Sequence, residues 1–230
     1  MFENKNTKIM NITKTILVIL LFWYGVYYIR MIPILLFKIN INSLTYNQQV
    51  LLSLFSSFVM AIILFFIYRE ELLAEFKKFK DNFIENMDQG VKYWLLGLAI
   101  MMVANLILTF VFKLGGANNE NALQEMLKVS PYIMLINAGF LAPFNEEIVF
   151  RKSLKNVINN KWIFVLVSFL MFGGAHVIGN ANNFLDYFYI VPYGALGGAF
   201  ALAYYKTDTV FTSMTFHMIH NISLVLLSFL

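Results

Sequence analysis

The sequence has no cysteine, and it contains only four prolines and three histidines in 230 residues. The absence of cysteine excludes disulfide bonds, thiolate metal sites and a cysteine nucleophile. Charged residues are also scarce, at 13% of the chain, whereas 60% of the residues are hydrophobic. Several apolar runs approach the ~20 residues that cross a bilayer core as a helix. We therefore expect a polytopic membrane protein in which Ser, Glu or a bound metal must supply any chemistry.

Long soluble linkers, repeats and low-complexity tracts are missing too, so we expect a single multi-pass membrane domain over residues 1–230. The apolar runs predict an all-α bundle of about seven transmembrane helices. Their predicted ranges are 15–37, 50–68, 93–112, 132–150, 162–178, 187–205 and 209–229. All but four of the 17 basic residues then lie on the side of the amino terminus, which is therefore cytoplasmic by the positive-inside rule.

Two segments outside these ranges carry the apolar spacing of a helix. Residues 69–92 place Leu and Phe at intervals of three, four and seven among charged residues, which is typical of an amphipathic helix on a membrane surface. Residues 117–130 follow two glycines and predict a loop and a short interfacial helix that ends before Pro131. We thus expect one or two interfacial helices beside the membrane bundle.

Ionisable residues in apolar segments are the main functional signal, because burial of a charge in a membrane is costly. Glu146 and Glu147 follow Pro143, and Arg151 lies one helical turn after Glu147. Glu147 and Arg151 can therefore pair on one helix face, while Glu146 points about 100° away. By itself the pattern is equally consistent with a structural ion pair at the end of a membrane helix.

The three histidines lie in the apolar segments that follow. His176 comes directly after a Gly-Gly-Ala sequence, whose small side chains let a neighbouring helix approach closely. His217 and Asn221 are four residues apart and share a helix face, where both can donate hydrogen bonds to one ligand atom. His220 is less well aligned with this face, and we interpret it as a bystander.

Three motifs in order resemble those of a known family: E-E-x-x-x-R at 146–151, F-x-x-x-H at 172–176 and H-x-x-x-N at 217–221. They resemble the CPBP intramembrane proteases, which include type II CAAX prenyl endopeptidases and bacterial Abi proteins. The resemblance covers about residues 131–229, which would form the protease core. It implies that Glu146 activates a water for attack on a peptide bond, with help from His176. His217 and Asn221 would then stabilise the oxyanion, and Glu147 and Arg151 would support the site.

Metal dependence is open at this stage, since members of this family have been described both as metalloproteases and as glutamate-dependent proteases. A zinc-dependent version would use Glu146, His176 and His217 as ligands. The sequence lacks H-E-x-x-H, and Asn221 is a poor zinc ligand but a good oxyanion donor, so we favour a mechanism without metal or other cofactor.

The resemblance implies a membrane-associated peptide or protein as substrate. The basic residues form no patch interleaved with aromatic residues, so no nucleic-acid partner is expected. The Lys-, Ile- and Asn-rich composition leads us to expect a bacterial cell membrane, where prenylated CAAX substrates are not expected. Two alternatives lie outside proteolysis: a proton-coupled transporter, because buried Glu and His also line ion pathways, and a non-catalytic immunity or scaffold protein.

Overall fold

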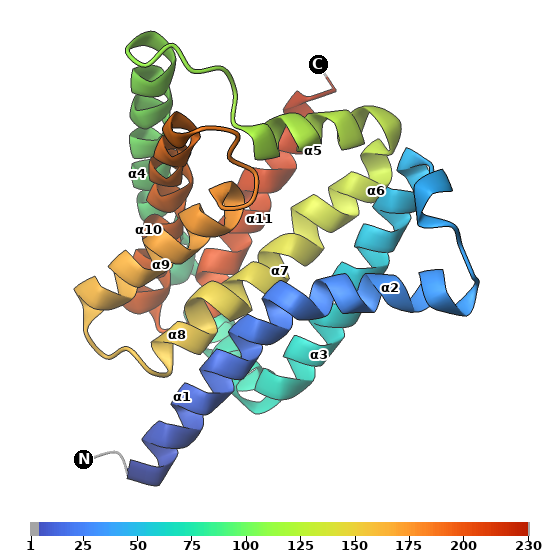
Figure 1. Cartoon of the computed structure of the whole chain (residues 1–230). Helices are drawn as coiled ribbons and strands as arrows, with labels where there is room; N and C mark the ends of the chain where they lie inside the picture. Colours follow the sequence, from blue (N-terminus) through green and yellow to red (C-terminus); the bar gives the residue numbers. More distant parts are fainter. Residues whose placement is uncertain (1–4, 230) are drawn as a thin grey trace. The chain divides into compact units, whose positions relative to one another are not determined.

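A computed structural model of the protein describes residues 5–229, and every regular element among them is a helix (Figure 1). The prediction of an all-α membrane bundle is therefore confirmed. Residues 1–4 and 230 lie outside the described residues. The chain divides into two compact units, and the single domain expected from the sequence stays a prediction.

The first unit consists of Met1–Leu72, Glu125–Val157 and Met218–Leu230. A helical run opens it, with the α-helices α1 (Lys5–Leu20) and α2 (Val26–Leu36) joined by one π-helical segment, η1 (Leu21–Gly25). After the 3₁₀ turn η2 (Ile41–Ser43) comes α3 (Tyr46–Asp81), most of which belongs to this unit.

A second helical run in the first unit carries the acidic pair and is drawn in yellow tones in Figure 1. It alternates α-helical and π-helical segments without a break. The order is α6 (Pro131–Ile136), η3 (Asn137–Leu141), α7 (Ala142–Glu147), η4 (Ile148–Lys152) and α8 (Ser153–Lys155). The π-helical segments change the rotation of side chains around the axis, and such segments are frequent at functional sites.

The second unit consists of Leu73–Gln124 and Ile158–His217. Its main helices are α4 (Phe83–Phe110), α9 (Lys161–Val177) and α10 (Ile190–Thr207). The 3₁₀ helix η5 (Phe184–Tyr189) precedes α10, and most of α5 (Asn118–Val129) lies here as well. The last helix, α11 (Val210–Leu227), begins in the second unit and ends in the first.

Each of the seven predicted spans coincides with one helical run. Five runs among the described residues are long and apolar enough to cross a membrane. They are Asn6–Leu36, Tyr46–Asp81, Phe83–Phe110, Pro131–Lys155 and Val210–Leu227, and α9 is a shorter apolar helix. Seven is therefore an approximate count of the spans.

The prediction of a separate amphipathic helix at residues 69–92 is wrong. The segment is helical, but α3 continues unbroken to Asp81 and α4 begins at Phe83. At 1.5 Å per residue, α3 is about 54 Å long, whereas a bilayer core is about 30 Å thick. The predicted short helix after Gly116 is present as α5.

Close helix packing in the second unit explains the small residues of α9 and α10. A Cβ atom added at Gly173 would lie 2.5 Å from the carbonyl oxygen of Ile190, so the start of α10 contacts the α9 backbone directly. A Cβ at Gly97 of α4 would lie 2.5 Å from the Cβ of Ala199 on the other side of α10. The predicted small-residue packing is therefore present, and it fixes the part of α9 that carries His176.

Candidate active site

The two adjacent glutamates have different surroundings in the first unit. Glu147 and Arg151 form an ion pair in which Arg151 Nη1 lies 3.1 Å from Glu147 Oε1, and both side chains are 0% exposed. The side chain of Glu146 is partly exposed. The pairing predicted from the i, i+4 spacing is thus present, and Glu146 is the acid that retains access to its surroundings.

Irregular backbone surrounds the acidic pair on both sides. The π-helical segment η3 ends just before α7, where Pro143 occupies the first turn, and η4 begins directly after Glu147. Pro143 has no amide hydrogen, so it frees a backbone carbonyl in the preceding turn. Asn221 uses such a carbonyl, because its Nδ2 donates a 2.8 Å hydrogen bond to the oxygen of Ala138 in η3.

Asn221 therefore ties the carboxyl-terminal half of α11 to the helical run that carries Glu146. A carboxamide has two N–H groups, and this bond uses one of them. Further contacts in the first unit hold the same run. Asn145 Nδ2 donates to the oxygen of Ser57 in α3 at 3.0 Å, and Thr15 Oγ1 of α1 donates to the oxygen of Ser153 at 2.9 Å. His220, predicted to be a bystander, is buried.

His176 lies near the carboxyl end of α9 in the second unit, with its imidazole ring held on two sides. The ring stacks on Tyr193 of α10 at a centroid distance of 4.6 Å and contacts Phe172 at 4.5 Å. Its Nδ1 lies 2.8 Å from the carbonyl oxygen of Phe172. Since a carbonyl can only accept, Nδ1 carries the hydrogen, and in the neutral ring the basic lone pair is on Nε2.

His217 approaches the same phenylalanine from α11. Its ring stacks on Phe200 at 5.0 Å and meets Phe172 edge-on at 5.4 Å, and the side chain is 2% exposed. Phe172 thus contacts both predicted catalytic histidines. It is itself fixed by α10, because a Cβ at Gly197 would lie 2.8 Å from the Phe172 Cβ. The structure brings the two histidines together around one aromatic ring, although they are far apart in the sequence.

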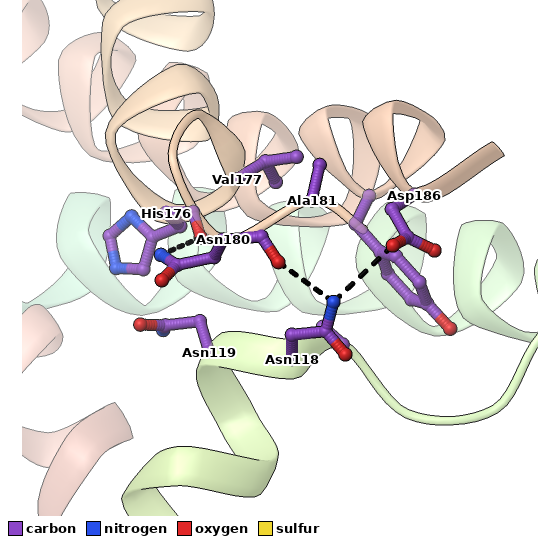
Figure 2. Close-up of a pocket in the computed structure, with 9 residues that line it drawn as sticks. Asn118, Asn119, His176, Val177, Asn180, Ala181 and Asp186 are labelled. Atoms are coloured by element: carbon purple, nitrogen blue, oxygen red, sulfur yellow. Dashed lines mark hydrogen bonds between the residues drawn. The ribbon is translucent and has the colours of Figure 1, made fainter. Parts of the chain in front are cut away.

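A small pocket lined by both polar and apolar residues adjoins His176 at the end of α9 (Figure 2). Its polar lining includes Asn118 and Asn119 of α5 and Asn180 and Asp186 of the segment after α9. Asn118 Nδ2 donates to the oxygen of Asn180 at 2.7 Å and to Asp186 Oδ2 at 3.3 Å. These bonds connect α5 to the segment that follows His176. This pocket was not predicted from the sequence, although five asparagines, at 118, 119, 180, 182 and 183, are a signal of polar sites in these two segments.

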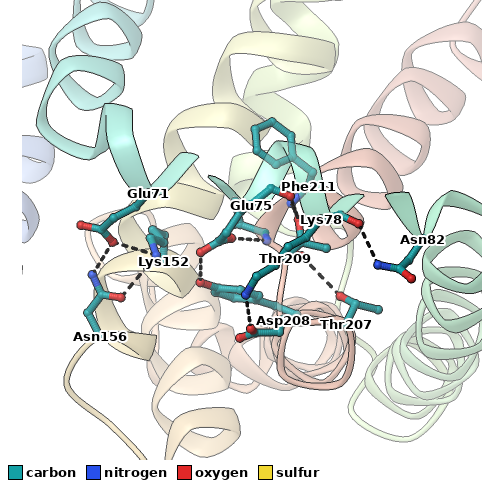
Figure 3. Close-up of polar contacts among 12 residues, drawn as sticks. Glu71, Glu75, Lys78, Asn82, Lys152, Asn156, Thr207, Asp208, Thr209 and Phe211 are labelled. Atoms are coloured by element: carbon teal, nitrogen blue, oxygen red, sulfur yellow. Dashed lines mark hydrogen bonds and ion pairs between the residues drawn. The ribbon is translucent and has the colours of Figure 1, made fainter. Parts of the chain in front are cut away.

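Two glutamates of α3 were also missed as organising residues (Figure 3). In the first unit, Glu71 binds Lys14 of α1 at 2.8 Å and Lys152 at 2.7 Å, and it accepts a 2.8 Å hydrogen bond from Asn156. This cluster joins α1, α3 and the carboxyl end of the run that carries the acidic pair. Glu71 therefore has partners from two other segments where the apolar part of α3 ends.

In the second unit, the buried Glu75 binds the start of α11 (Figure 3). Its carboxylate accepts hydrogen bonds from the Tyr204 hydroxyl at 2.9 Å and from the amide of Val210 at 2.7 Å. A carboxylate at a helix amino terminus is favourable because it satisfies an unpaired amide and the helix dipole. Glu75 therefore anchors the helix that carries His217. The i, i+4 spacing of Glu71 and Glu75 was the available sequence signal.

The predicted site residues are divided between the two units. Glu146, Glu147, Arg151 and Asn221 belong to the first unit, whereas His176 and His217 belong to the second. Within the described residues, no three His, Asp or Glu side chains are grouped so that they could hold a metal ion. Of the zinc ligands considered from the sequence, Glu146 belongs to the first unit and His176 and His217 to the second. Zinc binding by these three residues stays a hypothesis.

Comparison with known proteins supports the family resemblance. Residues 128–223 match the family model described as "Type II CAAX prenyl endopeptidase Rce1-like". The chain is 27% identical over 129 residues to the "Putative membrane peptidase YdiL" of Bacillus subtilis, which covers 54% of this chain and 49% of that protein. The resemblance predicted from the three motifs is thus confirmed.

Two further relatives are bacterial proteins whose names state no activity. An uncharacterized protein of Mycoplasma capricolum is 35% identical over 98 residues, which covers 40% of this chain and 28% of that protein. The UPF0177 protein YxdF of Lactococcus lactis is 24% identical over 151 residues, which covers 61% of this chain and 79% of that protein. The chain thus spans about half the length of the Bacillus relative and less than a third of the Mycoplasma one. No solved structure matches the chain significantly.

Proposed function

We propose that this chain, whose residues 128–223 match the Rce1-like family of type II CAAX prenyl endopeptidases, is an intramembrane endopeptidase. Its substrate would be a membrane-associated peptide or protein. The observation that carries the proposal is the unequal environment of the two glutamates. Glu147 is wholly buried and paired with Arg151, whereas Glu146 is partly exposed, as a general base must be to reach water.

In the proposed reaction Glu146 takes a proton from a water molecule, and the water oxygen attacks the carbonyl carbon of the peptide bond. His176 holds this water. Its imidazole suits this role because its orientation is fixed by Phe172 and Tyr193 and its lone pair is on Nε2. When the intermediate collapses, the C–N bond breaks and the proton on Glu146 passes to the leaving amine.

The developing negative charge on the carbonyl oxygen needs hydrogen-bond donors. We assign this role to His217 and Asn221, which share a face of α11. His217 is buried and stacked, so its ring is held in place before the reaction. Asn221 can donate through the N–H that does not bind Ala138. The assembly of these donors with Glu146 into one site is part of the proposal.

The Glu147–Arg151 pair is assigned a supporting role. It neutralises the buried carboxylate next to Glu146 and fixes the rotation of α7 relative to η4. A buried pair of this kind is costly to break, because either partner alone is an uncompensated charge. Glu146 is therefore held in a defined direction by its neighbour.

Cleavage of membrane peptides by purified variants tests the proposal. We expect Glu146→Gln to reduce turnover by a factor of roughly 10³, because it removes the base but keeps the side-chain shape. His176→Ala and His217→Ala should each reduce turnover about 10²-fold or more. Glu125→Gln is the matched control, since Glu125 is an exposed partner of Lys128 on α5, and it should leave turnover unchanged. Equal cleavage by all these proteins would reject the protease mechanism, and no cleavage by the wild type would favour a non-catalytic protein.

Metal analysis of the purified protein addresses the zinc alternative. We expect no stoichiometric zinc and no loss of turnover with chelators, because the proposed base and donors are side chains alone. Stoichiometric zinc, with activity lost to a chelator and restored by the metal, would instead assign Glu146, His176 and His217 as ligands. The transporter alternative would be favoured if the protein cleaved no peptide but took up a solute into vesicles together with protons, and if Glu146→Gln lost this uptake.

A further inference from the structure

The pocket beside His176 has a chemical character that the three motifs do not explain. Its lining combines the imidazole of His176 with carboxamides from two separate segments, Asn118 and Asn119 on α5 and Asn180 after α9. The preceding part of α9 is strongly apolar, from Trp162 to Phe172. Polar groups therefore gather around His176 only at this end of the helix.

The size of the pocket limits its occupant. It has room for about one water molecule and is too small for an amino-acid side chain of ordinary size. The Nδ2 groups of Asn118 and Asn180 are used in bonds to the oxygens of Asn180 and His176, respectively. Their side-chain oxygens are good acceptors, and a buried water is typically held by two to four such groups.

The pocket also lies next to an exposed part of the chain. Asn180 is exposed, as are Asn182 and Asn183, which follow it. The imidazole of His176, which stacks on Tyr193, lines the pocket together with Asn119. Water that enters from the exposed segment thus has polar partners up to the imidazole ring.

We propose that this pocket binds a water molecule beside His176 and is the route by which hydrolytic water reaches the imidazole. The inference rests on the proposed function, because only a hydrolase consumes a water molecule in each turnover. The carboxamides hold the water, which then moves to the ring of His176. From the ring it reaches Glu146, the proposed base.

Water-edited solid-state NMR of the ¹⁵N-histidine-labelled protein in lipid bilayers tests hydration without a substrate. The chain has three histidines, so the ring signals can be assigned by replacing each with Gln. We expect magnetisation from water to reach His176 faster than the buried His217. Ala181→Leu, which fills the pocket lining, should slow the transfer to His176 by roughly two- to threefold.

Asn180→Leu is a second variant that removes a polar lining group at an exposed position, so folding is retained. Asn182→Leu is its matched control, because Asn182 is exposed in the same segment but does not line the pocket. We expect Asn180→Leu to slow the transfer and to lower kcat about tenfold with unchanged KM, as loss of a positioned water requires. Asn182→Leu should change neither quantity.

Three outcomes would overturn the inference. The first is equal transfer to His176 and His217 in the wild type, and the second is unchanged transfer in Ala181→Leu. The third is a raised KM with unchanged transfer in Asn180→Leu, which would make the pocket a substrate contact. Full activity of Glu146→Gln would reject Glu146 as the proposed base while the NMR result still reports on the pocket, so the two failures are distinguishable.

Discussion

At the scale of single residues, neighbours in sequence have opposite surroundings. Glu146 and Glu147 are adjacent, yet the 100° rotation per residue of a helix directs one to a partly exposed position and the other into a buried ion pair. The i, i+4 spacing of Glu147 and Arg151 was sufficient to predict this division. Substitution of Glu146 should therefore affect turnover, whereas substitution of Glu147 should affect stability.

We expect Glu147→Gln to lower the free energy of unfolding by about 3–5 kcal/mol, because Arg151 would lose the carboxylate of its buried ion pair. Glu146→Gln should change stability by less than about 0.5 kcal/mol while it reduces turnover by a factor of roughly 10³. Denaturant unfolding of both variants in the same detergent measures the difference. If Glu146→Gln proved as unstable as Glu147→Gln, the acids would share a structural role and the proposed base would be lost.

At the scale of elements, the histidines depend on how closely α9 and α10 approach. Gly173 and Gly197 are positions where the two helices leave no room for a methyl group. The side chain that they fix is Phe172, which contacts both His176 and His217. Small residues in α10 therefore support the proposed active site, although none of them is assigned a chemical role.

Gly197→Ala and Gly198→Ala form a matched pair of substitutions in α10. A Cβ at Gly197 would lie 2.8 Å from the Phe172 Cβ and 3.2 Å from the oxygen of Ser168, so α9 has to move. We expect a loss of about 1–3 kcal/mol in stability together with lower kcat. At Gly198 the nearest atom is 3.5 Å away, an ordinary contact, so that variant should behave as the wild type. Thermal unfolding and peptide cleavage check both variants, and equal effects would contradict the close approach.

At the scale of the whole molecule, the positive-inside rule predicts the orientation of the chain in the membrane. The amino terminus and the junction of α3 with α4 are expected on the cytoplasmic side, and the segment between α9 and η5 on the outer side. Absence of cysteine makes this expectation easy to test, since each introduced thiol is the only one.

We expect Asn182→Cys to react with a membrane-impermeant maleimide in intact cells, because Asn182 is exposed in the outer segment. Asp81→Cys, exposed at the end of α3, should react only after the cells are opened. Gel-shift detection of the labelled protein measures both reactions, and the cysteine-free wild type is the blank. The reverse pattern would show that the amino terminus is outside and would invert the predicted topology.

The sequence by itself determined the all-α membrane fold, the positions of the seven helical runs and the pairing of Glu147 with Arg151. These features follow from apolar run length and from spacing within one helix, which are local properties. The prediction of a surface helix at residues 69–92 was wrong, because the apolar periodicity of a helix does not show where the helix begins. A helix on the membrane surface and the last turns of a longer helix such as α3 have the same periodicity.

Only the tertiary structure decided which distant residues meet. It placed Phe172 against both histidines, bound Asn221 to the carbonyl of Ala138 and gathered the asparagines beside His176. These contacts join segments far apart in the chain, and they depend on the π-helical segments and on the glycines that set helix separation. A periodicity identifies the face of a helix that is buried, but the partner of that face is chosen by packing.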